Sequence, residues 1–232
     1  MKKPFRVVFW AAVAALLVFV AAVAALYRAS QHVPEFYRQA VAVDSSLQQA
    51  AGHKMEQRAA QLASNVQKQG RWHEVFTAEQ INGWLAVRLT PWMEHRLGKA
   101  SAEAMRARIR DPRVAITPDQ VTLAFTCKSG LVQSVVSLSI DVRLAEPNVI
   151  VLRIRKARAG NVPLPLGQFL EQISEACRQV GWRIQWRENQ GDPEARVTML
   201  LPEVEDGREP RVEELRLEQD EVCVAGSTSR GR

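Results

Sequence analysis

The chain has 232 residues, 47% of them hydrophobic, which is enough for one ordinary domain with a core. Its formal net charge of +6 suits anionic partners. We expect no nucleic-acid partner, because the arginines alternate along predicted strands instead of clustering among aromatic residues. The three cysteines, Cys127, Cys177 and Cys223, lack metal or redox spacing, so we expect no metal and no cofactor. One disulfide and three buried thiols both remain possible.

The first predicted element is a hydrophobic helix. Val7 to Leu26 is a run of 20 residues without a charged side chain. At the rise of a helix it would span about 30 Å, the hydrocarbon thickness of a bilayer. Trp10 and Tyr27 lie near its ends, where amphipathic rings prefer the interface. The sequence therefore predicts a single transmembrane helix over residues 7–27.

The charges around this run predict its orientation. Lys2, Lys3 and Arg6 precede it, so residues 1–6 are expected in the cytoplasm and the rest of the chain outside the cytoplasmic (inner) membrane. A cleaved signal peptide is the alternative, although its apolar core is usually only about 7–15 residues long. Both interpretations export the domain.

Residues 28–70 are predicted to form a helical stalk. Apolar residues recur there at spacings of three and four, as on one face of a helix, and many are alanine. Pro34 fits a first helical turn, and Gly70 fits a helix end. A thin, alanine-rich stripe is typical of a stalk or of a helix that packs on one partner.

The next predicted helix has the best-specified start in the chain. Thr77 is a natural N-cap and Gln80 follows three residues later, which completes a capping box. Pro91 predicts a kink, or a restart with Thr90 as a new cap. The predicted apolar face comprises Ile81, Trp84, Leu85, Leu89, Trp92, Met93 and Leu97.

Residues 104–158 change to the period of a strand. Apolar residues alternate with polar ones in three runs that turn signals separate, which predicts an antiparallel meander of long strands. Arg106, Arg108 and Arg110 would project to one side of a strand. They could bind lipid headgroups or be ordinary solvent-facing charge.

The remaining elements complete an exported domain over residues 71–226. A second amphipathic helix is predicted from Pro165 to Gly181, followed by short strands. Residues 227–232 are expected to be a disordered tail. The fold class is therefore α+β, with an antiparallel, long-stranded sheet packed against two amphipathic helices.

No catalytic pattern is present, so we predict that the protein is not an enzyme. The chain has no phosphate-binding glycine loop and no nucleophile elbow. The four histidines are spaced about twenty residues apart, unlike metal ligands.

Two segments resemble a known family. The helix start Phe76–Leu85 and the Gly-Asn-Val-Pro-Leu-Pro segment at 160–165 are similar to the YpmS-like single-pass bacterial membrane proteins. The order of elements over residues 70–200 resembles tubular lipid-binding and AsmA-like domains. This resemblance implies a curved sheet that wraps a helix and holds an acyl chain, and it brings no catalytic residues.

We therefore expect an extracytoplasmic domain that binds lipid or another amphiphile. The alternative is an envelope interaction or assembly module that binds a protein partner and no ligand. Asn82 is the polar candidate in a ligand groove. The expected apolar lining comprises Trp84, Leu85, Trp92, Leu138, Phe169 and Ile173.

Overall fold

The computed structural model describes most of the chain. It leaves out residues 1, 2, 130, 131, 168, 169, 172, 173, 175–183, 200, 202, 203, 205, 206, 231 and 232. It also describes no side chain for residues 3–16, 129 and 132. All structural statements below concern the remaining residues.

The helices that are described without gaps lie in the first half of the chain, and most strands lie in the second. The helices are α1 (Lys3–Ser30), α2 (Glu35–Ala42), α3 (Ser45–Val66), α4 (Ala78–Val87), α5 (Leu89–Leu97) and α6 (Lys99–Arg108). The strands are β1 (Gly70–Thr77), β2 (Ile109–Thr117), β3 (Gln120–Ser129), β4 (Val132–Glu146), β5 (Val149–Ala159), β6 (Val162–Pro163), β7 (Ile184–Asn189), β8 (Asp192–Thr198), β9 (Arg208–Glu218) and β10 (Glu221–Arg230).

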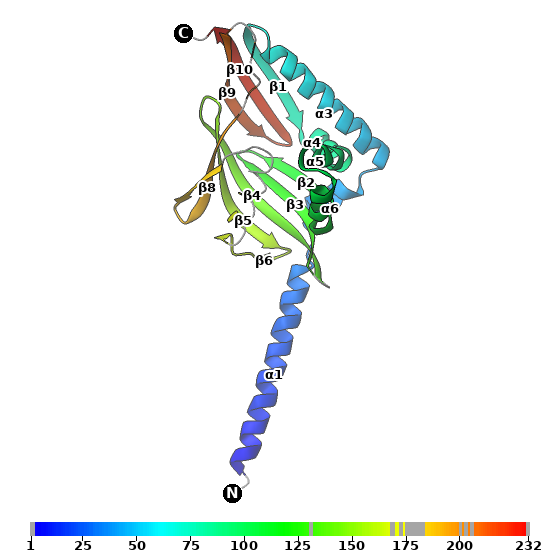
Figure 1. Cartoon of the computed structure of the whole chain (residues 1–232). Coiled ribbons are helices and arrows are strands. Elements are labelled where there is room, and N and C mark those ends of the chain that lie inside the picture. The colour runs from blue at the N-terminus through cyan, green and yellow to red at the C-terminus, as the bar shows by residue number, and fades with distance from the viewer. Residues whose placement is uncertain are drawn as a thin grey trace.

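The strands form two antiparallel sheets, which confirms the α+β class. The small sheet has the order β1-β10-β9, and the large one has the order β2-β3-β4-β5-β8-β7 with β6 paired to β5. In Figure 1 the small sheet lies over the end of the large sheet that is farther from α1. The helices α4, α5 and α6 flank the edge strand β2.

The register gives the large sheet one apolar face and one mainly polar face, on which Ala124 and Val135 form a small core with Tyr37. Leu123 of β3 pairs with Leu138 of β4, which pairs with Ala157 of β5. One residue along, the row Thr122–Ser139–Lys156 points to the opposite side. The alternation predicted from the sequence therefore produces the expected separation of apolar and polar side chains.

The small sheet closes one end of the apolar face. Ile116 of β2 is only 1% exposed and packs with Ala78 and Leu217. A second core joins Trp72 of β1 to Val212 of β9. The strand residues Val142 and Leu144 of β4 pack against these two cores. We call this region the closed end of the apolar face.

The predicted capping box of the helix at residues 78–97 is confirmed. The backbone N–H of Gln80 donates to Thr77 Oγ1, and the backbone N–H of Thr77 donates to Gln80 Oε1, both at 3.2 Å. The break in this helix comes at Arg88, which is the N-cap of α5, two residues before the expected cap Thr90. Pro91 lies in the first turn of α5, where its missing N–H costs no hydrogen bond.

The prediction of one helical stalk over residues 28–70 is wrong. The segment breaks after Ala42, and Asp44 caps α3 by accepting from the Ser46 N–H at 2.8 Å. The α3 helix then packs along α4 and β1 instead of projecting from the domain (Figure 1). The reason is a close crossing: a Cβ atom on Gly83 would lie 2.6 Å from the Gly52 nitrogen.

Two further predictions are corrected. Arg106 and Arg108 lie on the helix α6, not on a strand, because Ala and Arg are both strong helix formers and so short an alternation does not require a strand. The expected tail at 227–232 is ordered through Arg230 as part of β10, and Thr228 is buried. Thr228 accepts from Trp72 Nε1 at 3.2 Å and donates to the Val66 carbonyl at 2.8 Å, which explains this order.

The helix α1 covers the predicted span 7–27 and projects away from both sheets (Figure 1). Among the residues whose side chains the structure describes, none of the helices is long and apolar enough to cross a membrane. The first part of the predicted span, residues 7–16, falls outside those residues.

The C-terminal end of α1 docks on the turn after β5. The Asn161 N–H donates to the Ala29 carbonyl at 2.8 Å. Gly160 adopts a φ of +56°, and a Cβ atom there would lie 2.5 Å from the same carbonyl oxygen. Only glycine fits this approach, so the helix and the large sheet meet through a fixed backbone contact.

The second predicted amphipathic helix, Pro165 to Gly181, falls largely outside the described residues. Within the described chain, Cys127 and Cys223 are free thiols, so the pair does not form the disulfide that the sequence left open.

Candidate functional site

The candidate site is a cavity of about 620 Å³ between the large sheet and the helices that flank it. We call it the α4–β3 cavity. Its helical wall carries Leu85, Leu89 and Met93, and its sheet wall carries Leu123 and Phe125. A cavity of this size, apolar on two walls, lies within the range of pockets that bind small molecules.

An apolar patch on the sheet continues from this cavity. Leu123 and Phe125 of β3 pair with Leu138 and Val136 of β4, and Val121 pairs with Ile140. We define the apolar patch as Leu123, Phe125, Val136, Leu138 and Ile140. All five are half-buried, whereas Ile116 at the closed end of the same face is 1% exposed. The neighbours of Leu138 and Ile140 on β5, Ala157 and Ile154, are buried, so the partial exposure is a feature of these β3 and β4 residues.

Charged side chains form the rim of the α4–β3 cavity. Arg106 of α6 and Arg110 of β2 line it together with Glu103 and Asp111. Within the described part of the chain, Arg106 and Arg110 form no ion pair. The cavity therefore combines apolar wall residues with two guanidinium groups that have no ion-pair partner among the described residues, beside the carboxylates of Glu103 and Asp111. This mixture suits an amphiphile with a polar, anionic head.

Arg113 adds a buried cation to this region. It is 3% exposed, and its Nε donates to the Ala40 carbonyl at 3.3 Å. Burial lowers the pKa of the Arg113 guanidinium, while the nearby Asp111 charge opposes that shift. The cation holds α2 against β2, and this fixes one side of the cavity.

The structure brings together only part of the groove that the sequence predicted. Leu85 lines the α4–β3 cavity, and Leu138 lies in the apolar patch beside it. Trp84 and Trp92 instead contact one another edge to face, with ring centroids 6.3 Å apart, and neither lines this cavity. Phe169 and Ile173 lie outside the described residues.

Asn82, the predicted polar groove residue, closes the edge of the large sheet. Its Nδ2 donates to the Val114 carbonyl at 2.9 Å, and its Oδ1 accepts from the Val114 N–H at 2.7 Å. The side-chain amide thus replaces a neighbouring strand along β2. Asn82 also lines a smaller cavity of about 280 Å³ between α2, α3 and α4.

The sequence did not identify the sheet wall or the rim of the cavity. Leu123 and Phe125 were recognised as strand residues, but nothing local indicated that Leu85 would face them. The sequence predicts Arg106 and Arg110 as a possible headgroup patch on one strand; the structure places Arg110 on β2, as expected, but Arg106 on α6. Their facing position depends on α6, whose Ala-Arg alternation masked the helical period.

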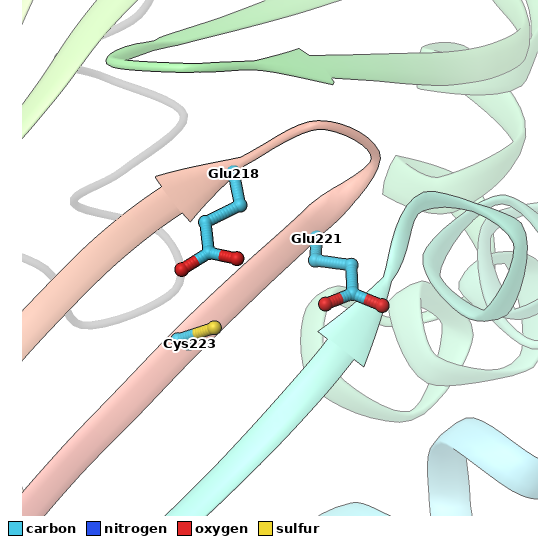
Figure 2. Close-up of side chains that lie close together, drawn as sticks. All are labelled: Glu218, Glu221 and Cys223. Atoms are coloured by element: carbon cyan, nitrogen blue, oxygen red, sulfur yellow. The ribbon is translucent and has the colours of Figure 1, made fainter.

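A second cluster of ionisable side chains lies at the β9–β10 hairpin. Glu218, Glu221 and Cys223 place one ligand atom each within 4.8 Å of one another, and Figure 2 shows them around the hairpin turn. Burial, followed by the charge of Glu218, raises the pKa of the Cys223 thiol. Arg216 lies 3.6 Å from Glu218. A protonated thiol and a neighbouring cation both disfavour metal binding, so we assign no site there.

Comparison of the chain with protein-family models, with curated proteins and with solved structures finds no match. The resemblance to YpmS-like and tubular lipid-binding proteins therefore stays a prediction.

Proposed function

We propose that this protein is a membrane-anchored domain that binds a lipid or another amphiphile in the α4–β3 cavity, without catalysing a reaction. The observation that carries the proposal is the half-buried apolar patch, which continues into a cavity with apolar walls and an arginine rim. An acyl chain would cover the patch, and Arg106 and Arg110 would face an anionic head. Covering apolar surface supplies the binding free energy, at about 25 cal/mol per Å².

Support for anchoring comes from α1. Beyond residue 16 it exposes large apolar side chains, among them Leu17 at 64%, Phe19 at 66% and Leu26 at 58%. In water such exposure is costly, whereas in a bilayer these side chains are in their preferred solvent. The proposed location is the cytoplasmic membrane, with the N-terminus inside and the sheets outside.

The test is native mass spectrometry of the full chain, extracted from a membrane fraction into an uncharged detergent. We expect a discrete retained mass in the fatty-acid or phospholipid range. A chain that carries no added mass contradicts the proposal and favours an interaction module that binds a protein partner. Washing the membranes with alkaline carbonate tests the anchor independently of the ligand. Release of the protein into the wash would contradict membrane anchoring by α1.

Variants locate the retained ligand. Leu123→Asp places a charge in the sheet wall and should remove the added mass. Gln133→Asp places the same charge on the polar face, at an exposed position of β4, and should retain it. Leu85→Trp fills the cavity from α4 without adding a charge, so it should also reduce ligand retention if the fold is kept.

A further inference from the structure

The polar face of the large sheet has an uneven distribution of charge partners. At its far end the cations are paired: Arg143 contacts Glu194 at 3.2 Å, and Arg153 contacts Asp192 at 2.8 Å. Arg155 contacts both Asp141 and Asp192. Toward α1 the pattern changes, because the side chains of Lys156 and Arg158 form no ion pair or hydrogen bond with any residue that the structure describes.

These two cations line a cavity of about 310 Å³, which we call the β5 basic pocket. The register explains its composition. Lys156 pairs with Ser139, and Ser139 pairs with Thr122, so an ammonium group and two hydroxyls lie in one row. Arg158 pairs with Ser137 in the next row of the same face. No carboxylate is among the described residues that line the pocket.

The wall opposite the sheet comes from the segment that follows α1. His32, Pro34 and Phe36 close that side, and Asn161 closes the base. The pocket lies beside the point where Asn161 contacts the last turn of α1. Hydroxyl, amide and guanidinium donors therefore converge on one concavity at the α1 end of the domain.

We propose that the β5 basic pocket binds a phosphate group. Lys156 and Arg158 supply the two charges, and the hydroxyls of Thr122, Ser137 and Ser139 supply neutral donors. A solvent-facing charge pair is the simpler alternative, but the other described arginines on this face from Arg143 to Arg155 have acidic partners. The phosphate can belong to a lipid headgroup at the membrane surface or to a free anion.

This site does not depend on the proposed function. The pocket opens on the polar face of the large sheet, whereas the apolar patch and its cavity lie on the other face and along the edge. A variant can therefore lose one ligand and keep the other.

The experiment uses the full chain in phosphate-free, uncharged maltoside micelles. Calorimetric titrations with dioctanoyl phosphatidic acid, inorganic phosphate and dioctanoylglycerol separate the two sources of phosphate. Binding of phosphatidic acid alone identifies a lipid headgroup, and equal binding of inorganic phosphate identifies a free anion. Absence of binding by both phosphate compounds overturns the proposal, as does equal binding of dioctanoylglycerol.

Charge variants assign the binding to the pocket. The double variant Lys156→Gln/Arg158→Gln should weaken phosphate binding by about tenfold or more. Arg211→Gln/Arg216→Gln removes the same charge from exposed positions on β9 and should change it by less than about twofold. Unchanged affinity in the first variant would refute the assignment. The Lys156→Gln/Arg158→Gln variant should still retain the ligand of the α4–β3 cavity. That result would show that the two sites bind independently.

Discussion

The two ends of one apolar sheet face differ in how completely they are covered. At the closed end, Ile116 is 1% exposed because the small sheet packs directly on it. At the end toward α1, the apolar patch carries the same residue types, yet its five members on β3 and β4 are only partly buried, while Ala157 and Ile154 beside them on β5 are buried. Residue type alone therefore does not determine how far an apolar side chain is buried; the cover that the rest of the chain provides does.

The largest expected effect compares these two ends directly. Ile116→Ala should lower the free energy of unfolding by about 2–5 kcal/mol, because it opens a cavity in a packed core. Leu138→Ala in the apolar patch should cost less, since part of its surface is already exposed to solvent. Chemical unfolding of the full chain in detergent, followed by circular dichroism, measures both. Equal losses would mean that the two ends are one core.

A second prediction concerns the packing of α4, which lies between α3 and the α4–β3 cavity. Gly83→Ala should cost about 1–3 kcal/mol, because its new methyl group would meet the backbone of α3 at Gly52. Gly167→Ala is the control, since no atom of the described residues lies within 4 Å of a Cβ atom at that position. Thermal unfolding of the two variants should separate them by several degrees.

A third prediction concerns the edge strand beside the cavity. Asn82→Ala leaves the Val114 N–H and carbonyl without their partners, which should cost about 1–3 kcal/mol. Hydrogen exchange at the Val114 amide should accelerate in this variant. Asn161→Ala, at an exposed asparagine whose backbone contact is retained, should leave that exchange rate unchanged. The same rate in both variants would contradict the role of Asn82 as a strand substitute.

The smallest expected effect is on the polar face. The hydrogen bond from Arg155 holds the pKa of Asp192 below its ordinary value, so the contact stabilises the fold above about pH 4. This contribution is lost as the pH falls through the lowered pKa. The melting temperature of Asp192→Asn should therefore depend less on pH between about 5 and 3 than that of the wild type. Glu209→Gln, in an exposed pair with Arg211, serves as the control.

Local signals predicted the elements that are defined by neighbouring residues. The Thr77–Gln80 capping box and the alternation in β3, β4 and β5 both depend on contacts within a few positions, and both are present. The path of α3 and the length of β10 were missed because they depend on distant partners. Gly52 meets Gly83, and Thr228 meets Trp72, across separations that no local pattern encodes.

The same limit applies to the candidate site. Leu85 and Leu138 could be chosen from their periodicity, since each belongs to an apolar stripe. The partners that complete the cavity and its rim could not, because their position depends on where α6 packs. The composition of the β5 basic pocket follows from the register of β4 and β5. In that register, Ser137, Ser139, Lys156 and Arg158 share one face.

The contact between Gly160 and Ala29 has a mechanical consequence. A flexible tether would let the sheets swing and tumble above the anchor, but here the last carbonyls of α1 rest directly on the turn after β5. In the membrane-anchored protein proposed above, the tilt of α1 in the bilayer would therefore set both the orientation of the domain and its distance from the membrane. A ligand of the α4–β3 cavity would then bind at one fixed distance from the lipid surface.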